Sequence, residues 1–308
     1  MSEETEATPC CCASCGIAVI DEIKLKECDD CDLARYCSDL CREEHRMQHE
    51  EDCKKRAAEL RDELLFKQPE SSHLGDCPIC FLPLPLDLKK SNLNTCCSTI
   101  ICKGCNVANE VREIEMKLQH KCPFCRKALA DTDEEVFQQN MRRIEANDPV
   151  AMLQQGMKQC NTGDNHGAIE YYTMAAALGN AEAHFKLALA YHLGEDVEKK
   201  WRKEIHHLEE AAIGGHPDAR YHLGCDEWEN NGGNGKIERA IKHWIISATQ
   251  GEDNSIKCLM FAFKKGFVEK DDLAATLRAH QAAVDATKSP QREAAERIER
   301  IRGRGLRM

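Results

Sequence analysis

The sequence predicts small zinc-stabilised α+β fingers in its first 130 residues, followed by an all-α solenoid of about three α/α repeats. Two observations support this prediction. Of the 20 cysteines in the 308 residues, 17 lie at or before Cys125, most of them in closely spaced pairs. Beyond that point a short motif recurs, with Gly179, Gly215 and Gly251 separated by 36 residues each time. The composition therefore divides the chain near residue 130.

The composition describes a polar chain with modest cores: mean hydropathy is −0.56, and 31% of the residues are charged. The first residues are acidic and polar, unlike a signal peptide, and no run of eighteen apolar residues occurs. We therefore expect a cytoplasmic or nuclear protein without membrane association. In such a reducing compartment, paired cysteines are more often metal ligands than disulfides. The net charge of −11 disfavours nucleic acid as a partner.

The first cysteine run contains eight ligands in four pairs, and the polar residues between them cannot build a core. The pairs are Cys12/Cys15, Cys28/Cys31, Cys37/Cys41 and His49/Cys53. Eight ligands complete two tetrahedral zinc sites and leave no position open for a reactive water. The zinc is therefore expected to be structural and to supply the folding free energy.

This spacing, with the Tyr36, Cys37, Ser38 step, resembles the MYND finger, a cross-braced protein-interaction module, within a domain of residues 10–55. The resemblance implies one site of Cys12, Cys15, Cys37 and Cys41 and another of Cys28, Cys31, His49 and Cys53. The chain departs from the family at Arg46, where a Trp is usual. Cys10, Cys11 and His45 are surplus candidates, interpreted more simply as spare thiols and a solvated histidine.

A polar helical connector of about Lys54–Lys67 is expected within a linker of residues 56–73, and Pro69 breaks it. The cysteines then resume as a second run of eight. Its pairs are Cys77/Cys80, Cys96/Cys97, Cys102/Cys105 and Cys122/Cys125. Together the two runs predict about four structural zinc ions.

The second run resembles a RING finger over residues 74–130, in the all-cysteine variety seen in the ubiquitin-ligase subunit of the CCR-NOT complex. The resemblance implies a cross-brace that assigns Cys77, Cys80, Cys102 and Cys105 to one zinc and Cys96, Cys97, Cys122 and Cys125 to the other. The chain departs from the family at Cys96 and Cys97, which are adjacent where at least one residue normally intervenes. This departure concerns the geometry of the second site.

A RING-type ligase forms no bond to ubiquitin and acts by positioning a charged conjugating enzyme. The resemblance implies that Ile79, Val107 and Pro123 dock this enzyme and that Arg126 clamps ubiquitin. The alternative is a finger that serves only as a scaffold, with Arg126 a solvated arginine. His120 precedes Cys122 closely but is interpreted as a surface histidine, because eight cysteines already complete two sites.

A linker helix is predicted within residues 131–148. Thr132 with Glu135 forms a capping box at its start. Val136, Phe137, Met141 and Ile144 form a narrow apolar stripe along it. Asp148 and Pro149 are expected to be the cap and first residue of the next helix.

The repeat region covers residues 149–286. Ala183, Ala219 and Ser255 share the register of the three glycines, as do Leu187, Leu223 and Leu259. A period of this length with glycine at a helix end indicates an α/α solenoid. The motif at Ala211–Gly224 resembles the Sel-one-like repeat, a relative of the tetratricopeptide repeat, which implies a concave surface for peptides or proteins.

Two remaining features of this half are interpreted as structural. The histidines of the repeats have no convincing ligand spacing, and no metal is assigned to them; they are His184, His206, His207, His216, His222 and His243. The basic tail of residues 287–308 is expected to be a solvated helix end, because its Glu and Arg residues lie four apart.

Two functions fit these sequence features. The first is a RING-type E3 ubiquitin-protein ligase, with the repeats and the MYND finger binding substrate or partner proteins. The second is a non-enzymatic adaptor in which every module binds proteins. The sequence contains no GxSxG, P-loop, HExxH or strand-linked GxGxxG motif, so no catalytic side chain is assigned.

Overall fold

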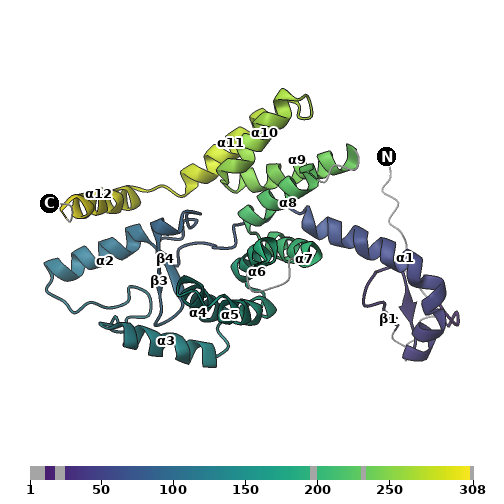
Figure 1. Ribbon diagram of the computed structural model, residues 1–308, viewed down its shortest axis with the longest axis horizontal. Helices are drawn as coiled ribbons and strands as arrows, with labels where there is room; N and C mark the ends of the chain where they lie inside the picture. The colour runs from purple at the N-terminus through teal and green to yellow at the C-terminus, as the bar shows by residue number, and fades with distance from the viewer. Residues whose placement is uncertain (1–10, 18–24, 195–199, 230–233, 306–308) are drawn as a thin grey trace. The chain divides into compact units, whose positions relative to one another are not determined.

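The computed structural model describes residues 11–17, 25–194, 200–229 and 234–305, and the chain forms two compact units (Figure 1). The first unit is Met1–Lys67 and the second is Gln68–Met308. The second finger and the helical repeats thus belong to one unit. Among the described residues, no helix has the length and apolar character needed to cross a membrane.

The first unit combines a short hairpin with one long helix. Strands β1 (Lys26–Glu27) and β2 (Arg35–Tyr36) pair antiparallel, and helix α1 (Asp39–Leu65) follows. Ser38 is the N-cap of α1, because its hydroxyl accepts a hydrogen bond from the backbone N–H of Cys41 at 3.3 Å. The separate connector helix expected at 54–67 is instead the second half of α1.

The second finger contains a longer hairpin, a helix and two knuckles. Strands β3 (Ser91–Asn94) and β4 (Thr99–Cys102) pair antiparallel after the 3-10 turn η1 (Leu88–Lys90), and α2 (Lys103–Glu115) follows β4 directly. Each knuckle is closed by a β-bridge, the first between residues 76 and 83 and the second between residues 121 and 128. The small core gathers around Cys77, Leu84, Ile101, Cys102 and Cys105.

Helix α3 (Asp133–Glu145) joins this finger to the repeats. Its N-cap is Thr132, as the capping box predicts. Of the expected apolar stripe, Ile144 is buried against the repeat core and Met141 packs beside it, whereas Val136 is exposed. The predicted start of the next helix is also correct, since Asp148 caps it and Pro149 is its first residue.

The repeats are helical pairs stacked along the chain (Figure 1). Their helices are α4 (Pro149–Asn161), α5 (Asn165–Ala177), α6 (Ala181–Leu193), α7 (Trp201–Ile213), α8 (Pro217–Glu229), α9 (Asn234–Thr249), α10 (Asp253–Lys264) and α11 (Lys270–Ala286). The three register glycines follow α5, α7 and α9 and all have positive φ, which glycine adopts without strain. Ala183, Ala219 and Ser255 are fully buried at the matching helix crossings. The predicted solenoid is therefore present.

The C-terminal segment differs from the sequence prediction. It forms helix α12 (Pro290–Gly305), which packs against α2 of the second finger. Ala295 is 1% exposed and Arg292 is 7% exposed. The interpretation of this segment as a solvated helix end is therefore wrong for its first turns, because a small residue and the stem of an arginine are covered by the finger.

Candidate zinc sites

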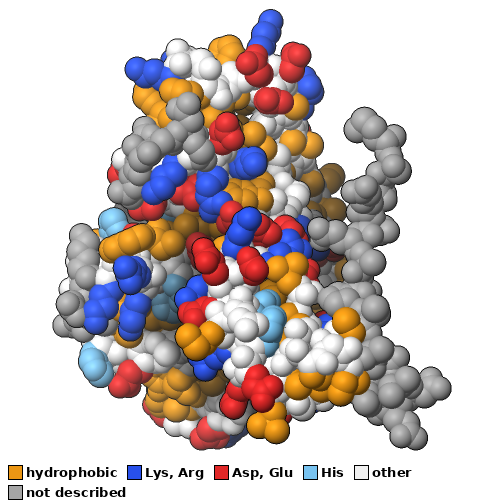
Figure 2. Space-filling model, turned by 90° about the vertical axis from the view of Figure 1, so that its right-hand side faces the viewer, with side chains coloured by type: hydrophobic (Ala, Val, Ile, Leu, Met, Phe, Trp, Pro, Cys, Tyr) orange, Lys and Arg blue, Asp and Glu red, His pale blue; other side chains and the backbone are white. Residues whose placement is uncertain are grey.

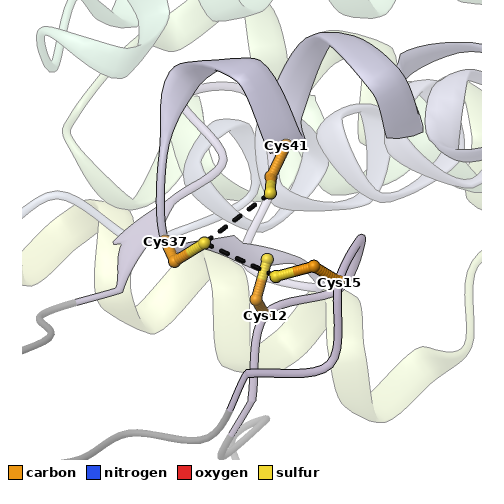
Figure 3. A group of neighbouring side chains, drawn as sticks. All are labelled: Cys12, Cys15, Cys37 and Cys41. Carbon is orange, nitrogen blue, oxygen red and sulfur yellow. Dashed lines mark hydrogen bonds between the residues drawn. The ribbon is translucent and has the colours of Figure 1, made fainter.

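The structure brings the sixteen expected ligands together in four groups. In the first unit, Cys12 and Cys15 come from the N-terminal knuckle, Cys37 precedes α1, and Cys41 lies in its first turn. Figure 3 shows the four sulfurs converging on one point. The second group consists of Cys28, Cys31, His49 and Cys53. The last two of these residues lie one helical turn apart on α1, so they face the same side.

The second finger has the same interleaved order. One group consists of Cys77, Cys80, Cys102 and Cys105, and the other of Cys96, Cys97, Cys122 and Cys125. The adjacent cysteines occupy the turn between β3 and β4, where Ser98 has a positive φ of 52°. This tight turn explains how two neighbouring residues both reach the same point.

The separations between the ligand atoms fit zinc. Tetrahedral thiolates about 2.3 Å from a shared zinc lie about 3.8 Å from one another. The sulfur–sulfur distance is 3.6 Å for Cys15 and Cys37, 3.7 Å for Cys28 and Cys53, and 3.8 Å for Cys80 and Cys102. In the fourth group two such distances are 3.4 and 3.9 Å. Each group thus forms a cage of the size that zinc requires.

Three of the cysteine pairs form the same knuckle. In each, the first cysteine accepts a hydrogen bond from the residue four positions later and donates one to the residue five positions later. The residue after the second cysteine has positive φ in all three knuckles: Gly16 at 72°, Phe81 at 57° and Arg126 at 64°. These turns direct backbone N–H groups toward the sulfurs, which favours the thiolate that zinc binds.

Crowding of the sulfurs shows why a cation belongs among them. Burial opposes ionisation of the Cys12 thiol, but backbone N–H groups of Cys15 and Cys37 lower its pKa to about 6. The pKa of Cys37 is raised to about 12, chiefly by the neighbouring sulfurs of Cys15 and Cys41. One thiolate thus disfavours the next unless a positive charge balances them. Zinc is the structural cofactor that these fingers bind.

The expected docking residues of the second finger have different environments. Ile79 is 38% exposed and Arg126 is exposed, whereas Val107 is 5% exposed and Pro123 is buried. Val107 and Pro123 are thus less accessible to a partner than Ile79 and Arg126. Sequence reasoning missed Phe124, which is 48% exposed. It occupies the same position in its CPFC knuckle as Ile79 occupies in CPIC, and this equivalence could have revealed it.

His120 connects the second knuckle to α2. Its Nδ1 lies 3.1 Å from a carboxylate oxygen of Glu113, which is 2% exposed. The backbone N–H of Lys121 donates to the other oxygen of the same carboxylate at 3.3 Å. Burial opposes ionisation of Glu113, but hydrogen bonds from Asn109 and His120 hold its pKa below the usual value. His120 lies outside the zinc cages and fixes the loop before Cys122.

The surplus candidates of the first run are accounted for in part. Cys11 belongs to none of the ligand groups among the described residues, and Cys10 lies outside them. His45 is half-buried: its Nδ1 lies 3.2 Å from the Tyr36 hydroxyl, and its ring stacks on His49. The departure at Arg46 leaves a charged, exposed side chain on α1.

A further group of metal-capable side chains was not anticipated. Nε2 of His73 and Nε2 of His216 lie 3.2 and 3.0 Å from the same oxygen of Glu182. Their rings stack nearly parallel, with centroids 4.0 Å apart. In-plane lone pairs of parallel stacked rings cannot converge on one ion, so in the observed geometry this group is a polar cluster in which His216 is hydrogen-bonded to Glu182. The signal was hidden because His73 precedes its partners by more than a hundred residues.

The fold and the sites define a class of protein in which cross-braced zinc fingers precede a solenoid of α/α repeats. The family model of the MYND finger matches residues 12–53, which form such a finger. No curated protein matches the sequence.

Two solved structures are similar to the chain. A Sel1 repeat protein from Oxalobacter formigenes is 21% identical with a TM-score of 0.44, over 59% of this chain and 73% of that one. A protective antigen of uropathogenic Escherichia coli strains, displaying an SLR fold, is 18% identical with a TM-score of 0.44, over 55% of this chain and 41% of that one. The residues that the MYND model matches hold two of the four ligand groups described above.

Proposed function

We propose that residues 74–130 act as a RING-type ubiquitin-ligase module that positions a charged conjugating enzyme. The observation that carries this proposal is the interleaved order of the two cysteine groups. The first and third pairs share one cage, and the second and fourth pairs share the other. This cross-brace ties both knuckles to the hairpin and α2, so their surface residues keep fixed positions, as catalysis by positioning requires.

The exposed knuckle residues support docking of a partner. Ile79 and Phe124 occupy equivalent positions in their knuckles, each following a proline and preceding the second cysteine. Both stay exposed although they are large and apolar. Val107 and Pro123 are buried, so the proposal assigns them no direct contact with the partner. The docking set is therefore Ile79 and Phe124, with Arg126 beside the last cysteine.

The backbone at Arg126 supports a role for its side chain. The equivalent residue of the first unit's N-terminal knuckle is Gly16, which adopts positive φ freely. A non-glycine residue in this region costs about 1–2 kcal/mol. No described residue accepts a hydrogen bond from the exposed Arg126 guanidinium, so its donors face solvent. A guanidinium held in this way can bridge carbonyl groups of two partner proteins.

An autoubiquitination assay tests the proposal. Zinc-loaded protein is incubated with activating enzyme, ubiquitin and a panel of conjugating enzymes. We expect Ile79→Ala, Phe124→Ala and Arg126→Ala each to lower the rate by about tenfold or more, as truncation of interface anchors commonly does. Ile114→Ala is the matched control, since Ile114 is 60% exposed on α2 of the same finger. Absence of activity across a broad panel would contradict the proposal.

Substitution with glycine separates the side chain from the backbone. Arg126→Gly relieves the positive-φ cost, so the finger is expected to gain about 1 kcal/mol while losing the cation. We therefore expect lower ubiquitination together with an equal or higher unfolding temperature. Arg126→Lys retains the charge without the planar fork and should give an intermediate rate. Full activity of Arg126→Gly would remove Arg126 from the mechanism.

The adaptor function is favoured by a different surface. Three aromatic side chains near the end of the repeats are exposed: Phe261, Phe263 and Phe267, at 39–48%. Two of them contact the ring of Trp228 edge-on. Exposed apolar clusters of this kind mark protein-binding surfaces. On the face shown in Figure 2, basic and acidic side chains lie intermixed around apolar ones. Pull-downs that recover stable partners, and lose them on Phe261→Ser, would support the adaptor function. The same conclusion requires that the second finger shows no ubiquitination activity.

A further inference from the structure

We propose that Arg292 of helix α12 is a positioning residue for the zinc cage of Cys77, Cys80, Cys102 and Cys105. The C-terminal helix would then be a working part of the second finger, more than 150 residues after the last ligand in the sequence. This inference rests on zinc in that cage. Only its consequence for docking at Ile79 rests on the proposed ligase function.

The hydrogen bonds of Arg292 surround the first knuckle. Nη2 donates to the sulfur of Cys80 at 3.4 Å and to the carbonyl of Leu82 at 3.1 Å. Nη1 donates to the carbonyl of Pro83 at 2.7 Å and to that of Thr287 at 2.7 Å. One guanidinium thereby joins a ligand, the backbone following it and the start of the C-terminal segment.

Charge explains why an arginine suits this position. A zinc ion with four thiolates carries a net charge of −2, and donors to the sulfurs offset it. Arg292 is 7% exposed, and no carboxylate among the described residues forms an ion pair with it. A buried cation needs a compensating anion. The thiolates of the cage supply this negative charge, and Arg292 in turn stabilises them.

Close packing holds Arg292 in place. A Cβ atom added to Gly104, at the start of α2, would lie 2.8 Å from Cγ of Arg292 and 3.0 Å from its Cα. Only glycine therefore allows α12 to approach α2 this closely. The surrounding ion pairs Lys103–Glu299 at 2.6 Å and Arg302–Glu110 at 3.2 Å are partly exposed, so they contribute little individually. Arg292 is the buried anchor of this contact.

The contact links the C-terminal helix to the knuckle that carries Ile79. When Arg292 is in place, the backbone after Cys80 is held at two carbonyls. When α12 separates, the Cys80 sulfur loses the hydrogen bond from Arg292, and the knuckle loses the helix that covers it. We therefore expect detachment of α12 to expose Cys80 and to speed zinc release from this cage alone.

The experiment measures cysteine modification in the full-length, zinc-loaded protein. A chelator is added in excess with N-ethylmaleimide, and the labelling of each cysteine is followed by mass spectrometry. Arg292→Met removes the donors and keeps a long apolar stem, and Arg292→Lys keeps the charge without the fork. Arg300→Met is the matched control, since Arg300 lies on α12 and its one ion pair among the described residues is with Glu296 of the same helix. Cys12, Cys28 and Cys125 report on the three other cages in the same sample.

We expect Arg292→Met to speed labelling of Cys80 about tenfold or more, the scale found when groups supporting a metal ligand are removed. Arg292→Lys should lie between this variant and the unsubstituted protein, and Arg300→Met should equal the latter. Gly104→Ala should speed labelling of Cys80 with Arg292 intact, because the added methyl displaces α12. Helical circular dichroism verifies folding of each variant.

Unchanged labelling of Cys80 in Arg292→Met would overturn the inference, and so would equal acceleration at Cys125. If Gly104→Ala fails to fold, Arg292→Lys still decides the outcome. The result is independent of ubiquitination, so an inactive finger with faster zinc release would refute the proposed function and leave this inference standing.

Discussion

Acidification is expected to weaken the repeats through His216, whose ring caps a helix only while its Nδ1 carries no proton. His216 immediately precedes α8, and its Nδ1 accepts a hydrogen bond from the backbone N–H of Ala219 at 3.4 Å, as an N-cap does. Its Nε2 donates to Glu182 at 3.0 Å. Asn180 and Glu252 cap α6 and α10 in the same register, 36 residues before and after. A proton on Nδ1 would remove the cap and place a positive charge at a helix N-terminus.

Some of the groups around His216 lower its pKa, and others raise it. Burial is the largest influence and lowers the pKa of His216 to about 4, although Glu182 opposes this shift. The ring of His73 stacks on it at 4.0 Å, and a carboxylate oxygen of Asp218 lies 3.9 Å from Nδ1. Lys186 pairs with the other oxygen of Glu182 at 3.0 Å. Burial likewise opposes ionisation of Glu182, but its histidine partners hold its pKa far below the usual value.

These pKa shifts determine whether folding stability rises or falls with pH, and by how much. The pKa of His216 is lower in the folded state than the ordinary 6.5, so the unfolded chain binds the proton first as pH falls. The stabilisation is complete above pH 6.5 and is lost progressively toward pH 4. Between pH 7.5 and pH 5 the expected loss is ~2 kcal/mol from this histidine. Glu182 changes stability in the same direction at still lower pH.

Urea unfolding followed by helical circular dichroism at pH 7.5 and pH 5, with zinc present, measures this loss. His216→Asn is the informative variant, because Asn retains a cap acceptor, as Asn180 does in the preceding repeat. The variant should be less stable at pH 7.5, since it loses the bond to Glu182, but its loss on acidification should be smaller by ~2 kcal/mol. Protonation of the zinc ligands affects both proteins equally and cancels. Equal losses in the two proteins would refute the role assigned to His216.

Two further predictions concern the metal and the packing of the repeats. Metal analysis of fresh, reduced protein should find one zinc for each of the four ligand groups, and two or fewer zinc ions would contradict the cross-brace. A chelator should unfold the fingers while the helical signal of residues 149–286 persists. Gly224→Ala should cost about 1–3 kcal/mol through overpacking, because the added Cβ would lie 2.5 Å from Nε1 of the buried Trp244. An unchanged urea midpoint would show that α8 and α9 can separate without cost.

The ligand groups and the glycines of the repeats were accessible from the sequence because they depend on local chemistry. A CxxC pair forms a knuckle through its own backbone hydrogen bonds, so spacing alone indicates the ligands. The glycines of the repeats likewise follow from the positive φ at a helix end, and the caps at Thr132 and Asp148 follow from side chains that bond their own helix. Each of these features is completed within a few residues of the chain.

The environments of the proposed docking residues depended on tertiary structure. The sequence places Ile79, Val107 and Pro123 on equal terms as apolar residues of the finger. The structure buries the last two and leaves Phe124 exposed instead. The chain also carries α12 back to the finger, and no local pattern near Arg292 indicates that contact.

What the sequence determined by itself is thus that zinc fingers precede helical repeats, and which cysteines gather into groups. The tertiary structure decided which side chains remain accessible and which distant groups share one environment. Arg292 lies 212 residues from Cys80, and His216 lies 34 residues from Glu182. Sequence periodicity and cysteine spacing indicate contacts between residues that lie within a few positions of one another in the chain. The burial of a charge depends on whatever element the whole fold brings against it.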